Sequence, residues 1–174
     1  PSNRIANAFF SEDLVINDSL LAIVESKAAY YENSSYVDQR WAVHTYHINK
    51  GGQDNWGYET TIYQPNSIRA NGVWTTIEIT QYQLVVGAYA SNSITGNIYR
   101  SGGRVFVYNK SYTPNGNLKY NTSQVLNATD DNDINYFGEN ITIEDDIMAI
   151  SSMNDARSFI NPTTFSRLLG LYER

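Results

Sequence analysis

The sequence contains no cysteine, and none of its hydrophobic runs approaches the ~18 residues that a membrane-spanning helix needs. Disulfides and thiolate metal sites are therefore excluded, and no membrane insertion is expected. Basic residues are scarce too, because 12 Lys and Arg stand against 18 Asp and Glu, for a net charge of -6. No basic run offsets this acidic background, so we expect no nucleic-acid partner.

The residues that are present are typical of a globular β protein. Hydrophobic residues make up 41% of the 174, and 14 residues are Tyr. Tyr, Thr and Val are enriched in strands, and a chain of this length can bury a sizeable core. Residues 1–174 lie within the usual length of one domain, and we treat them as a single segment.

One sequence pattern occurs three times, at a spacing of 63 and then 64 residues, without a gap. Its copies are residues 10–23, 73–86 and 137–150. Apolar residues share the same columns, as Leu14 does with Ile77 and Ile141. Each copy has an alternating strand, a short polar turn and a second apolar strand, which predicts a β-hairpin.

Two further strands follow each hairpin. The third strand is predicted at residues 41–46, 103–108 and 167–172, and the fourth at residues 56–64 and 119–127. Four-stranded units at this period are typical of β-propeller blades, whereas a β-sandwich rarely keeps such an internal register. We predict an all-β chain of β-propeller blades with four antiparallel strands each, in repeats over 9–66, 67–130 and 131–174.

The repeats also resemble the FG-GAP repeats of integrin α-chain propellers. The third copy contains Phe137-Gly138, the second contains Gly87-Ala88, and 102–108 and 126–130 are similar to the family's third and fourth strands. The resemblance covers nearly the whole chain, although the first copy has Phe10-Ser11 in place of Phe-Gly. It implies a propeller fold and ligand binding on the rim of the propeller.

Many FG-GAP repeats hold calcium in an Asp-rich loop between strands one and two, and here the sequence departs from the family. The corresponding turns are short and offer only Asp18, or Glu144 with Asp145 and Asp146, too few oxygens for the six or more that calcium takes. We therefore expect no cofactor. The other acidic cluster, Asp130, Asp131 and Asp133, is interpreted as a solvated turn, with a calcium site as the alternative.

The connections between strands two and three are predicted to be long loops, over residues 26–39, 89–102 and 152–166. Long loops on a rigid scaffold are frequent binding sites, and aromatic side chains bring a large contact area. The candidate ligand-binding residues are Tyr30, Tyr31, Tyr36, Tyr89, Tyr99 and Phe159. Each one alone is better explained by packing within its own loop, so only the group as a whole indicates an interaction face.

Catalysis finds little support in the sequence. The two histidines, His44 and His47, lie three apart on a predicted strand, so their side chains point to opposite faces. We predict a noncatalytic adhesion or assembly module that binds a protein or glycan ligand. The alternatives are a propeller lectin and an enzyme with its site in a central channel.

The predicted ring is incomplete, because about two and three-quarter blades cannot close on themselves and the third copy lacks its fourth strand. An open ring leaves apolar blade faces and a strand edge uncovered. We expect further blades of a longer chain, other subunits, or stacking in a filament to cover them, with the longer chain favoured. The isolated chain is accordingly not expected to be a well-behaved monomer.

Six Asn-x-Ser/Thr sequons favour an extracellular or cell-surface glycoprotein. The acceptor candidates are Asn17, Asn33, Asn109, Asn121 and Asn127; Asn140 lies in a predicted strand and is the poorest of the six.

We predict that the chain carries N-glycans when it is made in a glycosylating cell. The measurement is the intact mass before and after glycosidase treatment, with the chain made in a bacterium that lacks N-glycosylation as the control. A mass that glycosidase leaves unchanged would remove this support for an extracellular location.

Overall fold

The computed structural model describes residues 9–32, 35–65, 75–89, 103–127, 137–144, 147–153 and 167–173. Within these ranges the protein contains eleven β-strands and no helix. The strands form three antiparallel sheets, and in each sheet every strand is paired with its neighbours in the sequence. The predicted all-β class and the order of four, four and three strands are confirmed.

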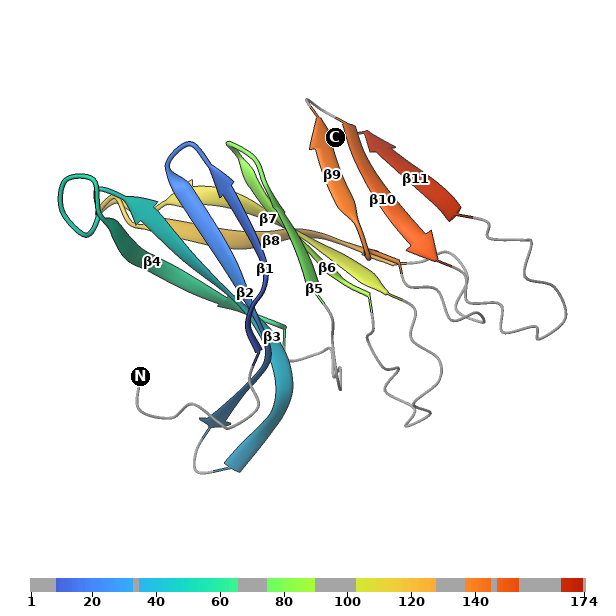
Figure 1. The fold of residues 1–174 in the computed structure, drawn as a ribbon, viewed down its shortest axis with the longest axis horizontal. Coiled ribbons are helices and arrows are strands. Elements are labelled where there is room, and N and C mark those ends of the chain that lie inside the picture. The colour runs from blue at the N-terminus through green and yellow to red at the C-terminus, as the bar shows by residue number, and fades with distance from the viewer. Residues whose placement is uncertain are drawn as a thin grey trace, which may run out of the picture.

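The three sheets follow one another along the chain and across the molecule (Figure 1). The first sheet contains β1 (Phe9–Asn17), β2 (Leu20–Glu32), β3 (Ser35–Ile48) and β4 (Trp56–Tyr63). The second contains β5 (Thr75–Ile79), β6 (Gln83–Ala88), β7 (Arg104–Tyr112) and β8 (Leu118–Asn127). The third contains β9 (Ile141–Glu144), β10 (Ile147–Met153) and β11 (Arg167–Glu173).

The prediction of a loop over residues 26–39 is wrong. β2 and β3 continue through this segment, where Tyr30 is paired with Val37, Tyr31 with Tyr36, and Glu32 with Ser35. Extending the ladder satisfies backbone N–H and C=O groups that a loop would leave to solvent, and Tyr and Val suit strands. The register shifts between Glu25 and Tyr30 show where the two strands depart from regular pairing.

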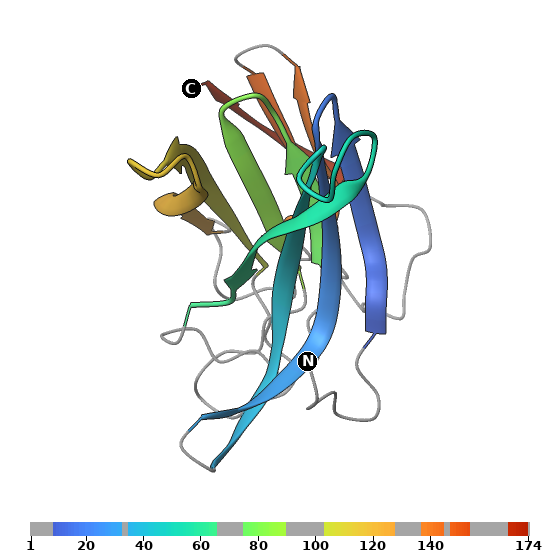
Figure 2. The same cartoon turned by 90° about the vertical axis from the view of Figure 1, so that its left-hand side faces the viewer.

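Tight turns join β1 to β2 in the first sheet and β5 to β6 in the second, and both turns lie at the same end of the molecule (Figure 2). Asp18, between β1 and β2, has a φ of 35°, and Asp tolerates this left-handed conformation better than most residues. Between β5 and β6, the Thr80 hydroxyl accepts hydrogen bonds from the backbone N–H groups of Tyr82 and Gln83. Both turns are thus stabilised by the short polar residues that the sequence places there.

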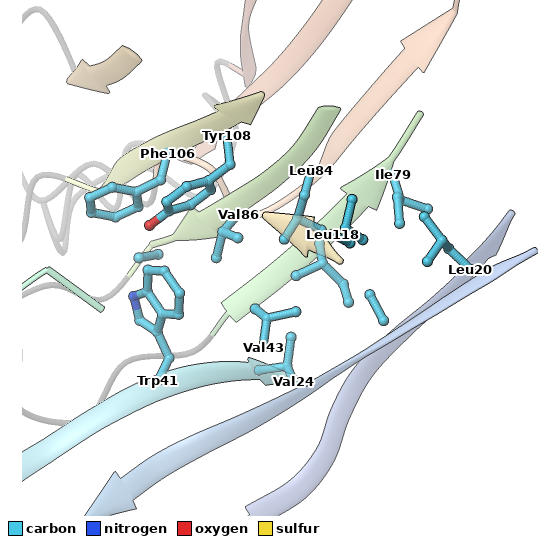
Figure 3. Close-up of a cluster of buried hydrophobic side chains, with 13 residues drawn as sticks. Leu20, Val24, Trp41, Val43, Ile79, Leu84, Val86, Phe106, Tyr108 and Leu118 are labelled. Atoms are coloured by element: carbon cyan, nitrogen blue, oxygen red, sulfur yellow. The ribbon is translucent and has the colours of Figure 1, made fainter. Parts of the chain in front are cut away.

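The second sheet is covered on both of its faces over β5, β6 and the first half of β7, whereas most of β8 is exposed. One face packs on the first sheet in a core that contains Val24, Trp41, Val86 and Phe106 (Figure 3). The other face packs on the third sheet in a separate core of buried residues: Val85, Val105, Val107, Leu126, Phe137, Met148 and Ile150. Because each face has its own core, the sheets form a stack of three layers.

The first strands of neighbouring sheets are also joined by hydrogen bonds from side chains. The carboxylate of Asp13 accepts a hydrogen bond from the backbone N–H of Ile77, at 2.9 Å. The Thr76 hydroxyl, at the corresponding position of the next repeat, donates to the carbonyl oxygen of Gly138, also at 2.9 Å. β5 is an edge strand of its sheet, so the bond to Ile77 uses a backbone group that faces away from the ladder, and Gly138 lies in the turn before β9.

The Phe137-Gly138 motif fits against the second sheet where that sheet has two glycines. A methyl group on Gly103 would overlap the backbone of Phe137, and one on Gly87 would overlap the carbonyl oxygen of Gly138. Gly138 itself has a φ of 91°, a conformation that side chains disfavour. These three glycines therefore allow two backbones to approach closely, and they position the third sheet.

Replacing Gly103 by alanine is expected to destabilise the fold by about 3 kcal/mol, because backbone atoms cannot move aside as a flexible side chain can. Gly116→Ala is the control, since open space surrounds Gly116 and only its φ of 78° opposes a side chain, at about 1 kcal/mol. Urea unfolding of both variants measures the difference. An equal loss in the two would show that the Phe137 turn does not sit against Gly103.

Candidate functional site

The first sheet carries an apolar surface on the side away from the second sheet. Leu14 and Ile16 are 56% and 59% exposed there, and they alternate along β1 with Val15, which packs on the inner core. Leu14 is paired with Ile23, and Ile16 with Leu21, so β2 continues the same surface. We define Leu14, Ile16, Leu21, Ile23 and His44 as the outer face of the first sheet.

The repeat shows what this surface corresponds to in the other sheets. Ile77 and Ile79, at the positions of Leu14 and Ile16, are only 5% and 4% exposed because they pack against the first sheet. Ile141 and Ile143, the next copies, pack against the second sheet. In both later sheets, these positions thus contact the preceding sheet. Among the described residues, no sheet precedes the first one.

A chain of four polar side chains lies at the β3 and β4 end of the outer face. His44 Nε2 is 2.8 Å from Glu25 Oε2, and His44 Nδ1 is 2.9 Å from Thr61 Oγ1. The Thr61 hydroxyl is also 2.9 Å from the hydroxyl of Tyr58. The Tyr58 ring meets that of Tyr46 edge to face, with centroids 6.0 Å apart. These contacts hold the imidazole of His44 in one orientation.

The order carboxylate, imidazole, hydroxyl is also that of a nucleophilic triad. Thr61 lies on β4, the edge strand of the first sheet, where backbone N–H groups lie in the sheet plane and either pair with β3 or point outward from the edge. They cannot be directed at negative charge that develops above the sheet, and such donors account for much of the rate in acyl transfer. The arrangement is better suited to fixing His44 than to catalysis.

The alignment of the repeats contains a signal for this cluster that the sequence analysis did not use. His44 is aligned with Phe106, and Glu25 with Ala88. Phe106 and Ala88 are both buried against the first sheet. Two polar residues have replaced two apolar ones at repeat positions that otherwise contact a neighbouring sheet. The predicted separation of the histidines is confirmed, because His44 is paired with Ile23 and His47 with the inward Leu20.

Three of the predicted rim residues, Tyr30, Tyr31 and Tyr36, belong to β2 and β3. Tyr99, Phe159, Asp130, Asp131 and Asp133 lie outside the described residues. In the part of the chain that the structure describes, no three His, Asp or Glu side chains are grouped so that they could hold a metal ion.

Tyr89 is the one predicted rim residue outside a strand that the structure describes. It follows β6 and is half-buried, and burial raises its pKa to about 12. The negative charges of Glu12, Glu139 and Asp13 add to this rise in pKa. Tyr89 therefore lies beside carboxylates near the first strands of the sheets, where its phenol stays protonated at neutral pH.

The sequons differ in how accessible their amides are. Asn109, Asn121 and Asn127 are exposed, and Asn33 lies outside the described residues. Asn17 is partly buried, and its amide donates to the carbonyl oxygen of Ile79 in the second sheet, at 3.4 Å, whereas the amide of the exposed Asn121 donates to Ser111 Oγ at 2.9 Å. A glycan on Asn17 would interfere with a contact between two sheets.

No family model, no curated protein and no solved structure matches this chain. No helix in the described ranges has the length and apolar character needed to cross a bilayer.

Glu78, on β5, generates a pH prediction. Burial raises its pKa above the usual 4.5, and the nearby charge of Asp13 raises it further. The folded state therefore holds this proton more tightly than the unfolded chain, so stability falls as the pH rises from about 4.5 through the raised pKa. Glu78→Gln removes the charge and should raise the free energy of unfolding at pH 7, by less than about 1 kcal/mol because the side chain is partly exposed.

The gain should disappear below about pH 4, where both states of the native protein carry a neutral Glu78. Thermal unfolding at pH 3.5 and pH 7 measures this difference. Glu144→Gln, at an exposed position of β9, is the control and should have little effect. A gain from Glu78→Gln that is the same at both pH values would contradict the electrostatic explanation.

Proposed function

We propose that this chain is a noncatalytic assembly module, a segment of a β-propeller of the FG-GAP type, and that the outer face of the first sheet docks a further sheet. The observation that carries the proposal is the exposure of Leu14 and Ile16 at positions whose copies, Ile77 and Ile79, are buried under a neighbouring sheet. Exposed aliphatic side chains grouped on one face indicate an interaction surface.

Three other features support a propeller. The repeats form consecutive antiparallel sheets, and each sheet packs on the one before it through the same repeat positions. The Phe137-Gly138 motif, which carried the resemblance, packs directly on glycines of the preceding sheet. The first strands β1 and β5 are also linked by Asp13, as expected where blades come together around a centre.

Three exposed sequons bear on where the module acts. The exposed sequons at Asn109, Asn121 and Asn127 favour an extracellular or cell-surface location, and assembly there is typical of adhesion proteins. Ligand binding by the loop rim, whether of a protein or of a glycan, remains part of the proposal. The clear structural support is for docking on the outer face.

The test is to supply the missing sheet within the same chain. A copy of residues 9–66 placed directly before Pro1 leaves 11 residues between the added sheet and β1, as residues 64–74 do between β4 and β5. If the outer face docks a sheet, the extended chain should unfold in one transition, several degrees above the original chain, because more apolar surface is buried.

The matched control is the same extended chain with Leu14→Asp and Ile16→Asp in the original first repeat. These side chains are more than half exposed in the single folded chain, so the changes should remove few contacts within it. In the extended chain they should separate the added sheet into a second, lower transition. Independent unfolding of the added sheet before any substitution would argue against the proposed function.

A further inference from the structure

No described residue packs on the third sheet from the side away from the second sheet. Ile147 is 54% exposed and Ala149 is partly buried, whereas Met148 and Ile150, which alternate with them along β10, are buried against the second sheet. We define Ile147 and Ala149 as the far face of the third sheet. Within the described ranges, the outer face and the far face thus lie at opposite ends of the stack, each without a sheet packed on it.

The repeat indicates that these two faces are complementary. Ala149 occupies the column of Ala22 and Val85. Ala22 belongs to the surface that covers the second sheet, and Val85 to the surface that covers the third. The far face of the third sheet thus corresponds to the faces with which the first and second sheets contact the next sheet. The outer face of the first sheet corresponds to the faces with which the second and third sheets contact the preceding sheet.

From this correspondence we infer that the sheet that docks on the outer face is the third sheet of a second copy of this chain. The inference rests on the proposed docking of a further sheet and adds the identity of the partner. Two copies related in this way make two identical contacts, in which the third sheet of each copy packs on the first sheet of the other. The result is a closed ring of six sheets, within the range that propellers adopt.

Charge complementarity supports a second copy over another partner. In the contact between the first and second sheets, Trp41 and Phe106 meet with ring centroids 5.5 Å apart. The column of Trp41 contains Arg167 at the start of β11, and the column of Phe106 contains His44 on the outer face. In the dimer this repeat position of the contact would have Arg167 of one copy opposite His44 of the other, whose Nε2 is 2.8 Å from Glu25 Oε2.

This replacement gives a physical reason for the polar chain on the outer face. Glu25 and His44 would be costly to cover with a purely apolar surface, because His44 satisfies only part of the hydrogen-bonding capacity of the Glu25 carboxylate. Arginine suits a carboxylate because its guanidinium can donate two parallel hydrogen bonds. The polar cluster would then select the third sheet of a second copy over the surfaces that cover the second and third sheets within a chain.

Sedimentation of the 174-residue chain tests the inference, with two variants that each block one face. Ile16→Lys blocks the outer face and Ile147→Lys the far face, and both side chains are more than half exposed, so each variant should fold with an unchanged circular dichroism spectrum. The native chain should sediment as a dimer. Each variant alone should dimerise at least about tenfold more weakly, because both contacts of the ring then contain a lysine.

Mixing the two variants is the decisive experiment. The intact far face of Ile16→Lys can dock on the intact outer face of Ile147→Lys, so the mixture should regain a dimer through one of its two contacts. If Ile147→Lys alone still dimerises like the native chain and mixing restores nothing to Ile16→Lys, the outer faces meet each other and the inference is overturned.

A charge exchange tests the partner residues. Glu25→Arg and Arg167→Glu should each weaken the dimer, and the chain with both changes should regain much of the loss, because each contact again joins opposite charges. No recovery in the double variant would remove Arg167 from the contact. If the native chain is a monomer although the extended chain docks its added sheet, the inference fails and the proposed function stands.

Discussion

The packing of one sheet face on the next is the interaction on which the rest of this structure depends. A four-stranded sheet with apolar residues on both faces is stable only when both faces are covered, and the second sheet meets this condition through two separate cores. Its strand β6 is therefore apolar almost without alternation, with Leu84, Val85 and Val86 fully buried. The first and third sheets are covered on one side by described residues, and this difference makes their remaining faces candidate sites.

The two contacts between sheets use the same repeat positions with different residues. In the first contact, Trp41 fills the space beside Phe106. In the second contact, the column of Trp41 contains Gly103, and the backbone of Phe137 occupies the space that a larger side chain would need. One scaffold thus accommodates either a large side chain or a close approach of two backbones, because the volume between the sheets must be filled in both cases. The short Phe-Gly motif fills the space between the second and third sheets with its backbone.

Much of this architecture could be predicted from the residues alone, and the failures have identifiable physical causes. The hairpins, the strand order and the short turns follow from alternation and turn residues, which act locally. The segment over residues 26–39 was misjudged because its length and polar residues are typical of loops. Its strand structure depends on backbone pairing between β2 and β3, which the residue types of the segment do not reveal. The cluster of Glu25, His44 and Thr61 was missed because its members come from three strands.

The sequence by itself determined that three copies of one unit exist, which residues alternate within each strand, and that positions such as Leu14 and Ile77 are equivalent. Alternation distinguishes the two faces of a strand, but it contains no information about what lies against either face. Only the tertiary structure decided that Ile77 is covered while Leu14 is exposed, because burial depends on the neighbouring sheet and not on the residue. The outer face was therefore visible in the sequence as a pattern and became a candidate site only in the folded stack.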